Sequence, residues 1–194
     1  MKSFEEYVAE AARVHGHICA GQILGLRMAL HGLELLGIAD PEGRDRKRLV
    51  TFVEIDRCAT DAVGVVTGCR LGKRALKFRD FGKVAATFVD LQSGRAVRVA
   101  ALDSAKQLAR ERCPEIASKN EQQMRAYREM AADELFTHQW VEVTLDPPDV
   151  PGWKGTPAVC EACGETVQFR REVVREDRTL CRPCAGEGYY RPAG

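Results

Sequence analysis

The chain has 194 residues, of which 45% are hydrophobic, so it is long enough for one full domain and a small second module. Its 29 lysine and arginine residues nearly balance 28 aspartate and glutamate residues, which leaves no whole-chain electrostatic footprint for nucleic acid. The first 16 residues lack the apolar core of a signal peptide, and the longest apolar stretch contains charged residues, so we expect a cytoplasmic protein without a membrane span.

The first 40 residues predict two helices joined by a short break. Ser3 begins a capping-box pattern ahead of a helix over residues 4–14. A second helix over residues 21–36 places its apolar residues at helical spacing. Gly21 and Gly25 lie four residues apart on that helix, and this spacing favours close packing against another element.

The central part of the chain predicts a mixture of strands and helices. Runs of β-branched and aromatic residues bounded by turn residues are typical of strands, and longer stretches with helical periodicity separate them. The predicted strands are 49–55, 76–79, 84–89, 96–99 and 141–145, and the predicted helices are 59–67, 103–112 and 118–135. These elements make up a first domain over residues 1–145.

A stretch rich in proline and glycine marks the predicted domain boundary. Three prolines and one glycine occur between residues 146 and 152, which suits an extended linker over residues 146–157. The remaining residues, 158–194, form a small module that contains four of the eight cysteines.

The tail cysteines follow the pattern Cys-x-x-Cys, 17 residues, Cys-x-x-Cys. Two such pairs turn four thiolates onto one ion, so we predict a structural zinc held by Cys160, Cys163, Cys181 and Cys184. Residues 168–171 and 173–175 are predicted to form a hairpin between the pairs. Disulfides and an iron–sulfur cluster are the alternatives, and the absence of an export signal favours the metal over disulfides. A four-thiolate shell is closed, so no catalysis is assigned to it.

The charges of the tail are mixed. Five arginines between residues 170 and 182 are interleaved with acidic residues between 161 and 187. This arrangement favours a solvated surface or a protein interface over a nucleic-acid site.

A second group of potential ligands lies at the junction of the first two helices. His15, His17 and Cys19 alternate within five residues, and an extended backbone would place them on one side. Cys58 and Asp61 share one face of the helix that follows the first strand. If the two helix starts meet, His17, Cys19 and Cys58 form a three-ligand site with an open position. The alternative is that these histidines and cysteines are structural.

Residues 68–73 have the glycine and lysine content of a phosphate loop without its spacing. The glycines are one residue too close, and Arg74 replaces the Ser or Thr that binds magnesium. A nucleotide site is therefore not predicted here, and Lys73 is assigned, with His15 and Asp61, as a group that supports the ligands or contacts substrate.

Several blocks along the chain resemble one family in the same order. The segment His15–Gly21 (HGHICAG) resembles the HGHxCxG signature of the FmdE family, named after the E-subunit of formylmethanofuran dehydrogenase. Residues 54–61 (EIDRCATD), 67–73 (TGCRLGK) and 80–88 (DFGKVAATF) resemble its next blocks. One departure is Ala20, where many members have proline. The tail resembles the treble-clef zinc module that some members append.

This resemblance implies an α+β fold with a mixed β-sheet packed with helices, of the FwdE/GAPDH-like kind, plus a treble-clef or zinc-ribbon-like tail. It implies a link to molybdenum or tungsten formylmethanofuran dehydrogenase and one-carbon metabolism. Matched by position, His17 and Cys19 belong to the signature and Cys58 to the second block, while His15 orients rather than ligates.

Three functional hypotheses follow. The first is a metal-binding accessory protein with a transition metal of unknown identity, zinc included, near His17 and a structural zinc in the tail. The second is a metal-dependent enzyme with an open zinc site, and the third is a zinc-finger regulator that binds nucleic acid or protein. For the first we expect a homodimer whose partners are formylmethanofuran dehydrogenase or related oxidoreductase components.

Overall fold

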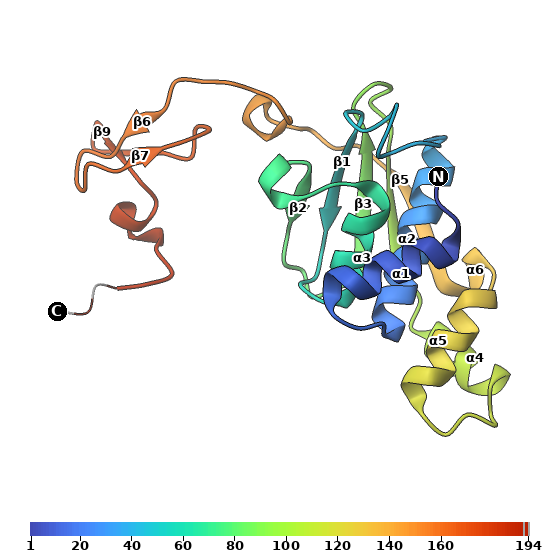
Figure 1. Cartoon of the computed structure of the whole chain (residues 1–194). Helices are drawn as coiled ribbons and strands as arrows, with labels where there is room; N and C mark the ends of the chain where they lie inside the picture. Colours follow the sequence, from blue (N-terminus) through green and yellow to red (C-terminus); the bar gives the residue numbers. More distant parts are fainter. Residues whose placement is uncertain (192, 194) are drawn as a thin grey trace. The chain divides into compact units, whose positions relative to one another are not determined.

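The structure, a computed structural model, describes residues 1–191 and 193. The chain divides into two compact units, Met1–Thr144 and Leu145–Gly194 (Figure 1). None of the helices in the described residues combines the length and the hydropathy needed to cross a membrane.

The first unit is built on a five-stranded mixed sheet. Its strands are β1 (Leu49–Val53), β2 (Leu76–Phe78), β3 (Ala85–Asp90), β4 (Ala96–Ala101) and β5 (Phe136–Val141). The order across the sheet is β2-β1-β3-β4-β5, with β1 and β2 parallel and the other neighbours antiparallel. The α+β class with a mixed sheet is thereby confirmed.

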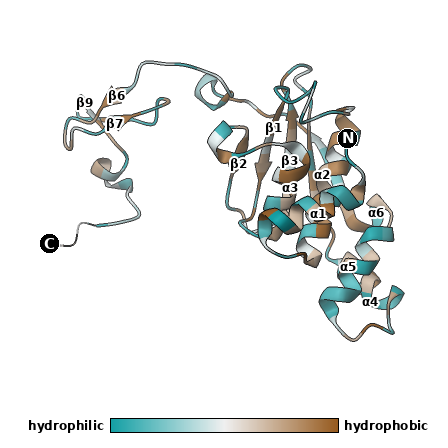
Figure 2. Ribbon diagram, in the orientation of Figure 1, coloured by the Kyte–Doolittle hydropathy of each residue, from teal (hydrophilic) through white to brown (hydrophobic). Residues whose placement is uncertain are grey.

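Helices cover one face of this sheet and one end of it. They are α1 (Phe4–His15), α2 (Ala20–Leu36), α3 (Cys58–Thr67), η1 (Leu71–Lys73), α4 (Ser104–Arg112), α5 (Lys119–Glu129) and α6 (Ala132–Leu135). Figure 1 shows α1, α2 and α3 in front of the sheet and α4, α5 and α6 together at its end. Strand β1 is largely hydrophobic, whereas α4 and α5 are mostly hydrophilic (Figure 2).

The first two helices begin and end where their sequence predicts. The capping box between Ser3 and Glu6 is formed at the start of α1. Gly16 ends α1 at φ +93°, and Gly37 ends α2 at φ +68°, a region that glycine enters without steric cost. The break between the helices is therefore fixed by Gly16 on one side and by the extended residue Cys19 on the other.

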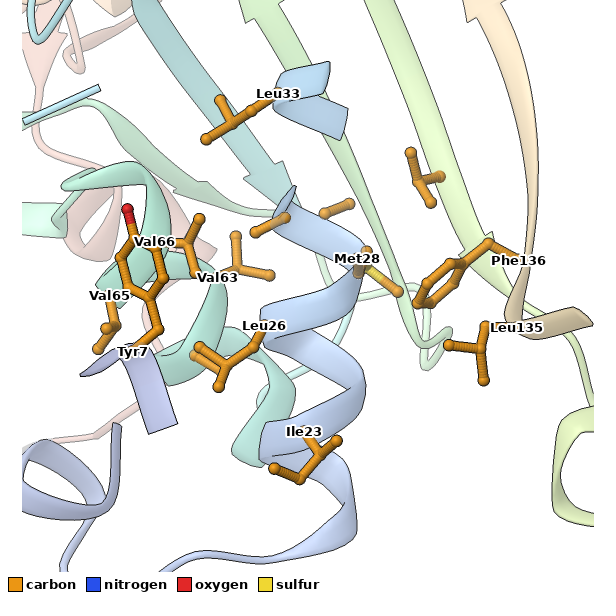
Figure 3. Close-up of a cluster of buried hydrophobic side chains, with 14 of the residues drawn as sticks. Tyr7, Ile23, Leu26, Met28, Leu33, Val63, Val65, Val66, Leu135 and Phe136 are labelled. Carbon is orange, nitrogen blue, oxygen red and sulfur yellow. The ribbon is translucent and has the colours of Figure 1, made fainter. Parts of the chain in front are cut away.

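The core lies between α2 and its neighbours. Figure 3 shows labelled side chains of α1, α2, α3, α6 and the start of β5 gathered there. Ile23, Leu26 and Leu33 of α2 are fully buried, and each such side chain contributes about 1.5–3 kcal/mol relative to an exposed one. Gly25 allows α2 to lie directly against α3, because a Cβ there would lie 2.5 Å from the carbonyl oxygen of Ala59. The prediction of close packing at this glycine is confirmed.

Two predicted elements of the first unit are wrong in their bounds. The helix expected over 118–135 is broken after Glu129, because Arg27 of α2 donates hydrogen bonds to the carbonyl oxygens of Tyr127, Arg128 and Met130 and so ends α5. The strand expected over 141–145 is instead Phe136–Val141. Val141 pairs with Ala96, the first residue of β4, so residues beyond Val141 extend past the strand they would pair with.

The second unit consists of two small hairpins and a helical turn. Strands β6 (Ala158–Val159) and β7 (Thr166–Val167) pair, as do β8 (Val173–Arg175) and β9 (Arg178–Leu180), and η3 spans Pro183–Glu187. The predicted hairpin between 168–171 and 173–175 is wrong. Phe169 and Arg170 have positive φ and form a turn, so Val173–Arg175 pairs with the segment that follows it.

Part of the predicted linker has structure of its own. Pro147–Asp149 forms a short 3₁₀ turn, η2, and the Asp149 side chain is mostly buried. Its carboxylate accepts a hydrogen bond from Arg171 at 2.6 Å within the same unit. Residues 147–149 therefore pack with the module that follows them.

Candidate metal centres

The four tail cysteines are brought together by two turns of the same kind. In the first, the Gly164 N–H donates to the Cys160 carbonyl oxygen at 2.8 Å, and Gly164 has φ +77°. In the second, the Ala185 N–H donates to the Cys181 carbonyl oxygen at 2.9 Å. Each turn presents two sulfurs on one side. The Glu161 N–H donates to the Thr179 carbonyl oxygen at 2.9 Å, and this bond holds the first turn beside β9.

The sulfur positions fit a tetrahedral zinc ion. The four Sγ atoms of Cys160, Cys163, Cys181 and Cys184 all lie within 4.8 Å of one another. The Sγ atoms of Cys163 and Cys181 are 3.9 Å apart, and zinc–sulfur bonds of about 2.3 Å place tetrahedral sulfurs about 3.8 Å apart. Backbone N–H groups of Cys181 and Cys163 lower the pKa of the Cys160 thiol to about 6, which favours the thiolate that zinc requires. These residues form a structural zinc site.

The arginines of the tail are paired within the tail. Arg171 contacts Asp149, and Arg175 contacts Glu187 at 3.2 Å. Arg178 and Arg182 lie 3.9 Å from Glu161 and Glu187, respectively. Because these guanidinium groups already face carboxylates, they offer little unpaired positive charge to a phosphate backbone.

The second centre lies where α1 ends and where α2 and α3 begin. His15 is the last residue of α1, and Cys19 is the extended residue that precedes α2. Cys58 is the first residue of α3. Gly21 lets the two helix starts approach each other, because a Cβ at that position would lie 3.3 Å from the Cβ of Cys58 and 3.8 Å from the Sγ of Cys19. The two helix starts therefore meet.

Three side chains of this centre present ligand atoms to a common point. Ligand atoms of His15, His17 and Cys19 all lie within 4.8 Å of one another. The two imidazole rings have centroids 4.9 Å apart. His15 Nδ1 lies 2.7 Å from the Asp61 carboxylate, so this carboxylate fixes the Nδ1–H tautomer and leaves Nε2 as the free ligand atom.

Cys58 lies beside this group rather than within it. Its thiol contacts that of Cys19, and burial followed by this contact raises the pKa of Cys58. Both thiols are partly exposed. The sequence predicted His17, Cys19 and Cys58 as the ligands with His15 as an orienting group, whereas the structure gathers His15 with His17 and Cys19 and places Cys58 next to them.

Other candidates from the sequence are not brought to this centre. Lys73 is exposed in η1, and its charge acts on Cys69, whose pKa is raised by burial and lowered in part by that lysine. Cys69 is buried, and its thiol donates to the carbonyl oxygen of Leu49 at 3.6 Å. Within residues 1–191 and 193, no described contact joins Lys73 to the histidines or to Cys19.

One residue at this centre was missed by the sequence analysis. The Ala20 N–H, at the start of α2, donates to Oδ1 of Asn120 at 2.9 Å. Asn120 lies 100 residues further along the chain, on α5, and nothing in the sequence around it indicates a link to the HGHxC segment.

Comparison with known proteins identifies the family. Residues 14–137 match the family model described as FmdE, molybdenum formylmethanofuran dehydrogenase operon, and residues 155–190 match the prokaryotic dksA/traR C4-type zinc finger. The first match spans well over half of the chain. The protein therefore belongs to the FmdE family and carries a C4-type zinc finger at its carboxyl end.

Two similar proteins are informative. A crystal structure of an FmdE-like protein of tungsten formylmethanofuran dehydrogenase, from Syntrophus aciditrophicus, has a TM-score of 0.65 and 26% sequence identity, and the similarity covers 98% of this chain and 96% of that one. A probable S-adenosyl-L-methionine-binding protein from Archaeoglobus fulgidus is 40% identical over 90 residues, or 46% of this chain. The chain matches only 25% of the length of that relative.

Proposed function

We propose that this protein is a metal-binding accessory protein in which the amino-terminal unit holds one transition-metal ion and the tail zinc stabilises a small interaction module. The observation that carries the proposal is the convergence of His15, His17 and Cys19 on one point at the junction of α1 and α2. Two imidazoles and one thiolate suit zinc, nickel, copper or iron.

The contacts around these ligands support the proposal. Metal-binding histidines usually donate their second ring N–H to a carboxylate, and His15 has this arrangement with Asp61 at 2.7 Å. Three protein ligands leave one position open for water or another ligand. Cys58, which contacts Cys19, is the thiol nearest to the gathered group. In this proposal Cys58 faces the open position, where an incoming ligand or a metal in transfer would meet it.

The role of the protein follows from its family and its tail. The family description names the formylmethanofuran dehydrogenase operon, so we propose a component of that enzyme or of a related oxidoreductase as the recipient of the metal or of a cofactor. The tail, whose arginines are internally paired, would contact a protein partner rather than nucleic acid.

The proposal is tested by counting metal ions in protein purified without added metal. Elemental analysis by mass spectrometry should give two ions per chain in the wild type. Cys19→Ala should retain only the tail zinc, whereas Cys58→Ala should retain both ions because Cys58 lies outside the gathered ligands. Cys113→Ala is the matched control, since Cys113 is a buried cysteine away from both centres, and circular dichroism checks that each variant is folded.

Two results would change the assignment. A wild-type chain with a single ion that is lost in Cys160→Ala would overturn the amino-terminal metal site. Loss of one ion in Cys58→Ala as well as in Cys19→Ala would replace the present ligand set by His17, Cys19 and Cys58.

A further inference from the structure

The start of α2 lacks the cap that its own sequence would normally provide. The residue that precedes a helix usually accepts a hydrogen bond from a first-turn N–H through an Asn, Asp, Ser or Thr side chain. In α2 this residue is Cys19, and its side chain makes no such bond. The thiol is instead directed to the group that contains His15 and His17. The first N–H groups of α2 must therefore find their acceptor elsewhere.

Asn120 provides that acceptor from a different helix. The Ala20 N–H donates to Oδ1 of Asn120 at 2.9 Å, and Ala20 is the residue directly after Cys19. Asn120 does not cap its own helix, because Ser118 does so by accepting from the Glu121 N–H at 3.4 Å. The side chain of Asn120 is thus free to serve α2.

The other end of α5 is also attached to α2. Arg27 donates to the carbonyl oxygens of Tyr127 at 2.7 Å, Arg128 at 2.9 Å and Met130 at 2.6 Å. Ala20 and Arg27 are seven residues apart, which is two turns, so both lie on the same face of α2. Bonds at both ends fix α5 along α2 and hold Asn120 at the start of that helix.

We propose that Asn120 is a positioning residue for the amino-terminal metal centre, because it caps α2 in place of Cys19 and so leaves the Cys19 thiol free to ligate. This inference rests on the proposed function. Asn120 does not contact the ligands His15 and His17. It acts through the backbone at Ala20, which sets where Cys19 leaves the chain and hence where its sulfur lies.

The test compares Asn120→Ala with two other variants in the full-length protein. Zinc affinity of the amino-terminal site is measured by competition with a chelator of known affinity, and cobalt is used to record the thiolate-to-metal charge-transfer band. Asn120→Ala should weaken zinc binding at this site by about tenfold and shift the cobalt band, as loss of a supporting contact around a metal ligand commonly does. Asn120→Asp keeps an acceptor oxygen and should restore the wild-type affinity and spectrum.

Ser118→Ala is the control for a purely structural effect. It removes the cap of α5 itself and weakens the same helix without touching Ala20. The proposal requires that Ser118→Ala leave the cobalt spectrum unchanged at a comparable loss of thermal stability. Equal effects of Ser118→Ala and Asn120→Ala on zinc affinity, or no effect of Asn120→Ala, would overturn it.

A second readout separates this inference from the proposed function. In metal-free protein, Cys19 in Asn120→Ala should react with iodoacetamide at a rate different from wild type, as followed by peptide mass spectrometry, while Cys58 should react unchanged. If the wild type binds no amino-terminal ion but this difference is present, the metal proposal fails and the positioning role stands. If the alkylation rates of Cys19 are the same in both proteins, the positioning role fails.

Discussion

At the scale of single residues, a buried ion pair closes the far end of the sheet. Asp90, at the end of β3, is almost fully buried and accepts hydrogen bonds from Arg48 at 2.8 and 3.2 Å. Ser93 donates to the same carboxylate at 2.7 Å. The Arg48 guanidinium is the main reason that the pKa of Asp90 is lowered to about 2. The carboxylate is therefore ionised in the folded protein well below the pH at which it is protonated in the unfolded chain.

This pKa predicts a pH dependence of stability. A carboxyl group with a lowered pKa stabilises the fold above its unfolded pKa, and the contribution disappears as pH falls toward its folded pKa. We expect the Asp90 contribution of about 2 kcal/mol to be lost between about pH 4 and pH 2. Urea unfolding of Asp90→Asn should show a correspondingly weaker pH dependence than wild type in that window. Asp103→Asn, a fully exposed control, should follow the wild type, and identical curves for Asp90→Asn and wild type would contradict the prediction.

The residues of the amino-terminal centre show how far sequence alone can reach. Three potential ligands in five positions were visible, because alternation in an extended segment is a local property. The preference of the structure for His15 over Cys58 was not visible, because it depends on how α3 presents Asp61 to the end of α1. The bond between Ala20 and Asn120 joins residues 100 positions apart, and no local pattern reports such a contact.

At the scale of elements, the contact between α2 and α3 depends on a glycine. A Cβ at position 25 would lie 2.5 Å from the carbonyl oxygen and 2.7 Å from the Cα of Ala59, and both are backbone atoms that cannot rotate away. In an isolated helix Gly→Ala is stabilising by about 1 kcal/mol, whereas overpacking a core costs about 1–3 kcal/mol. The sign of the net effect therefore reports which of these two contributions dominates.

We expect Gly25→Ala to lower the free energy of unfolding by about 2 kcal/mol, because α3 would have to move as a unit. Chemical denaturation monitored by circular dichroism measures this change. Gly72→Ala is the matched control, since no atom lies within 4 Å of a Cβ built there and its backbone has no positive φ. A Gly25→Ala variant as stable as wild type would show that α2 and α3 are not in contact at this point.

The elements that sequence predicted well are those with strong local signals. The first helix has a capping box and a glycine stop, and the observed bounds differ from the prediction by a single residue. The strand over 141–145 was placed wrongly because an edge strand is set by its partner. Strand β4 starts at Ala96, and its pairing ends at Val141 whatever alternation follows. The tail hairpin was misplaced for a related reason, since the positive φ of Glu176 and Asp177 places the turn after Arg175.

At the scale of the whole molecule, the two units are stabilised in different ways. The first unit has an extensive apolar core drawn from α1, α2, α3, α6 and the sheet. The buried core of the second unit consists of Cys160, Leu180, Cys181 and Ala185. Two of these four residues are zinc ligands, so little apolar burial remains to offset the entropy of folding when the ion is absent.

Removal of zinc should therefore unfold the second unit and leave the first one folded. In the full chain treated with a strong chelator, hydrogen exchange measured by mass spectrometry should become fast over residues 158–190, while α2 and the sheet remain protected. Binding of an ion to four thiolates supplies most of the folding free energy of such a small module, so partial protection is not expected. Cys160→Ser should produce the same pattern without chelator, because it removes one of the four ligands. Unchanged protection of β8 and β9 in zinc-free protein would show instead that the hairpins are stable on their own, and the zinc would then be dispensable for the fold of the tail.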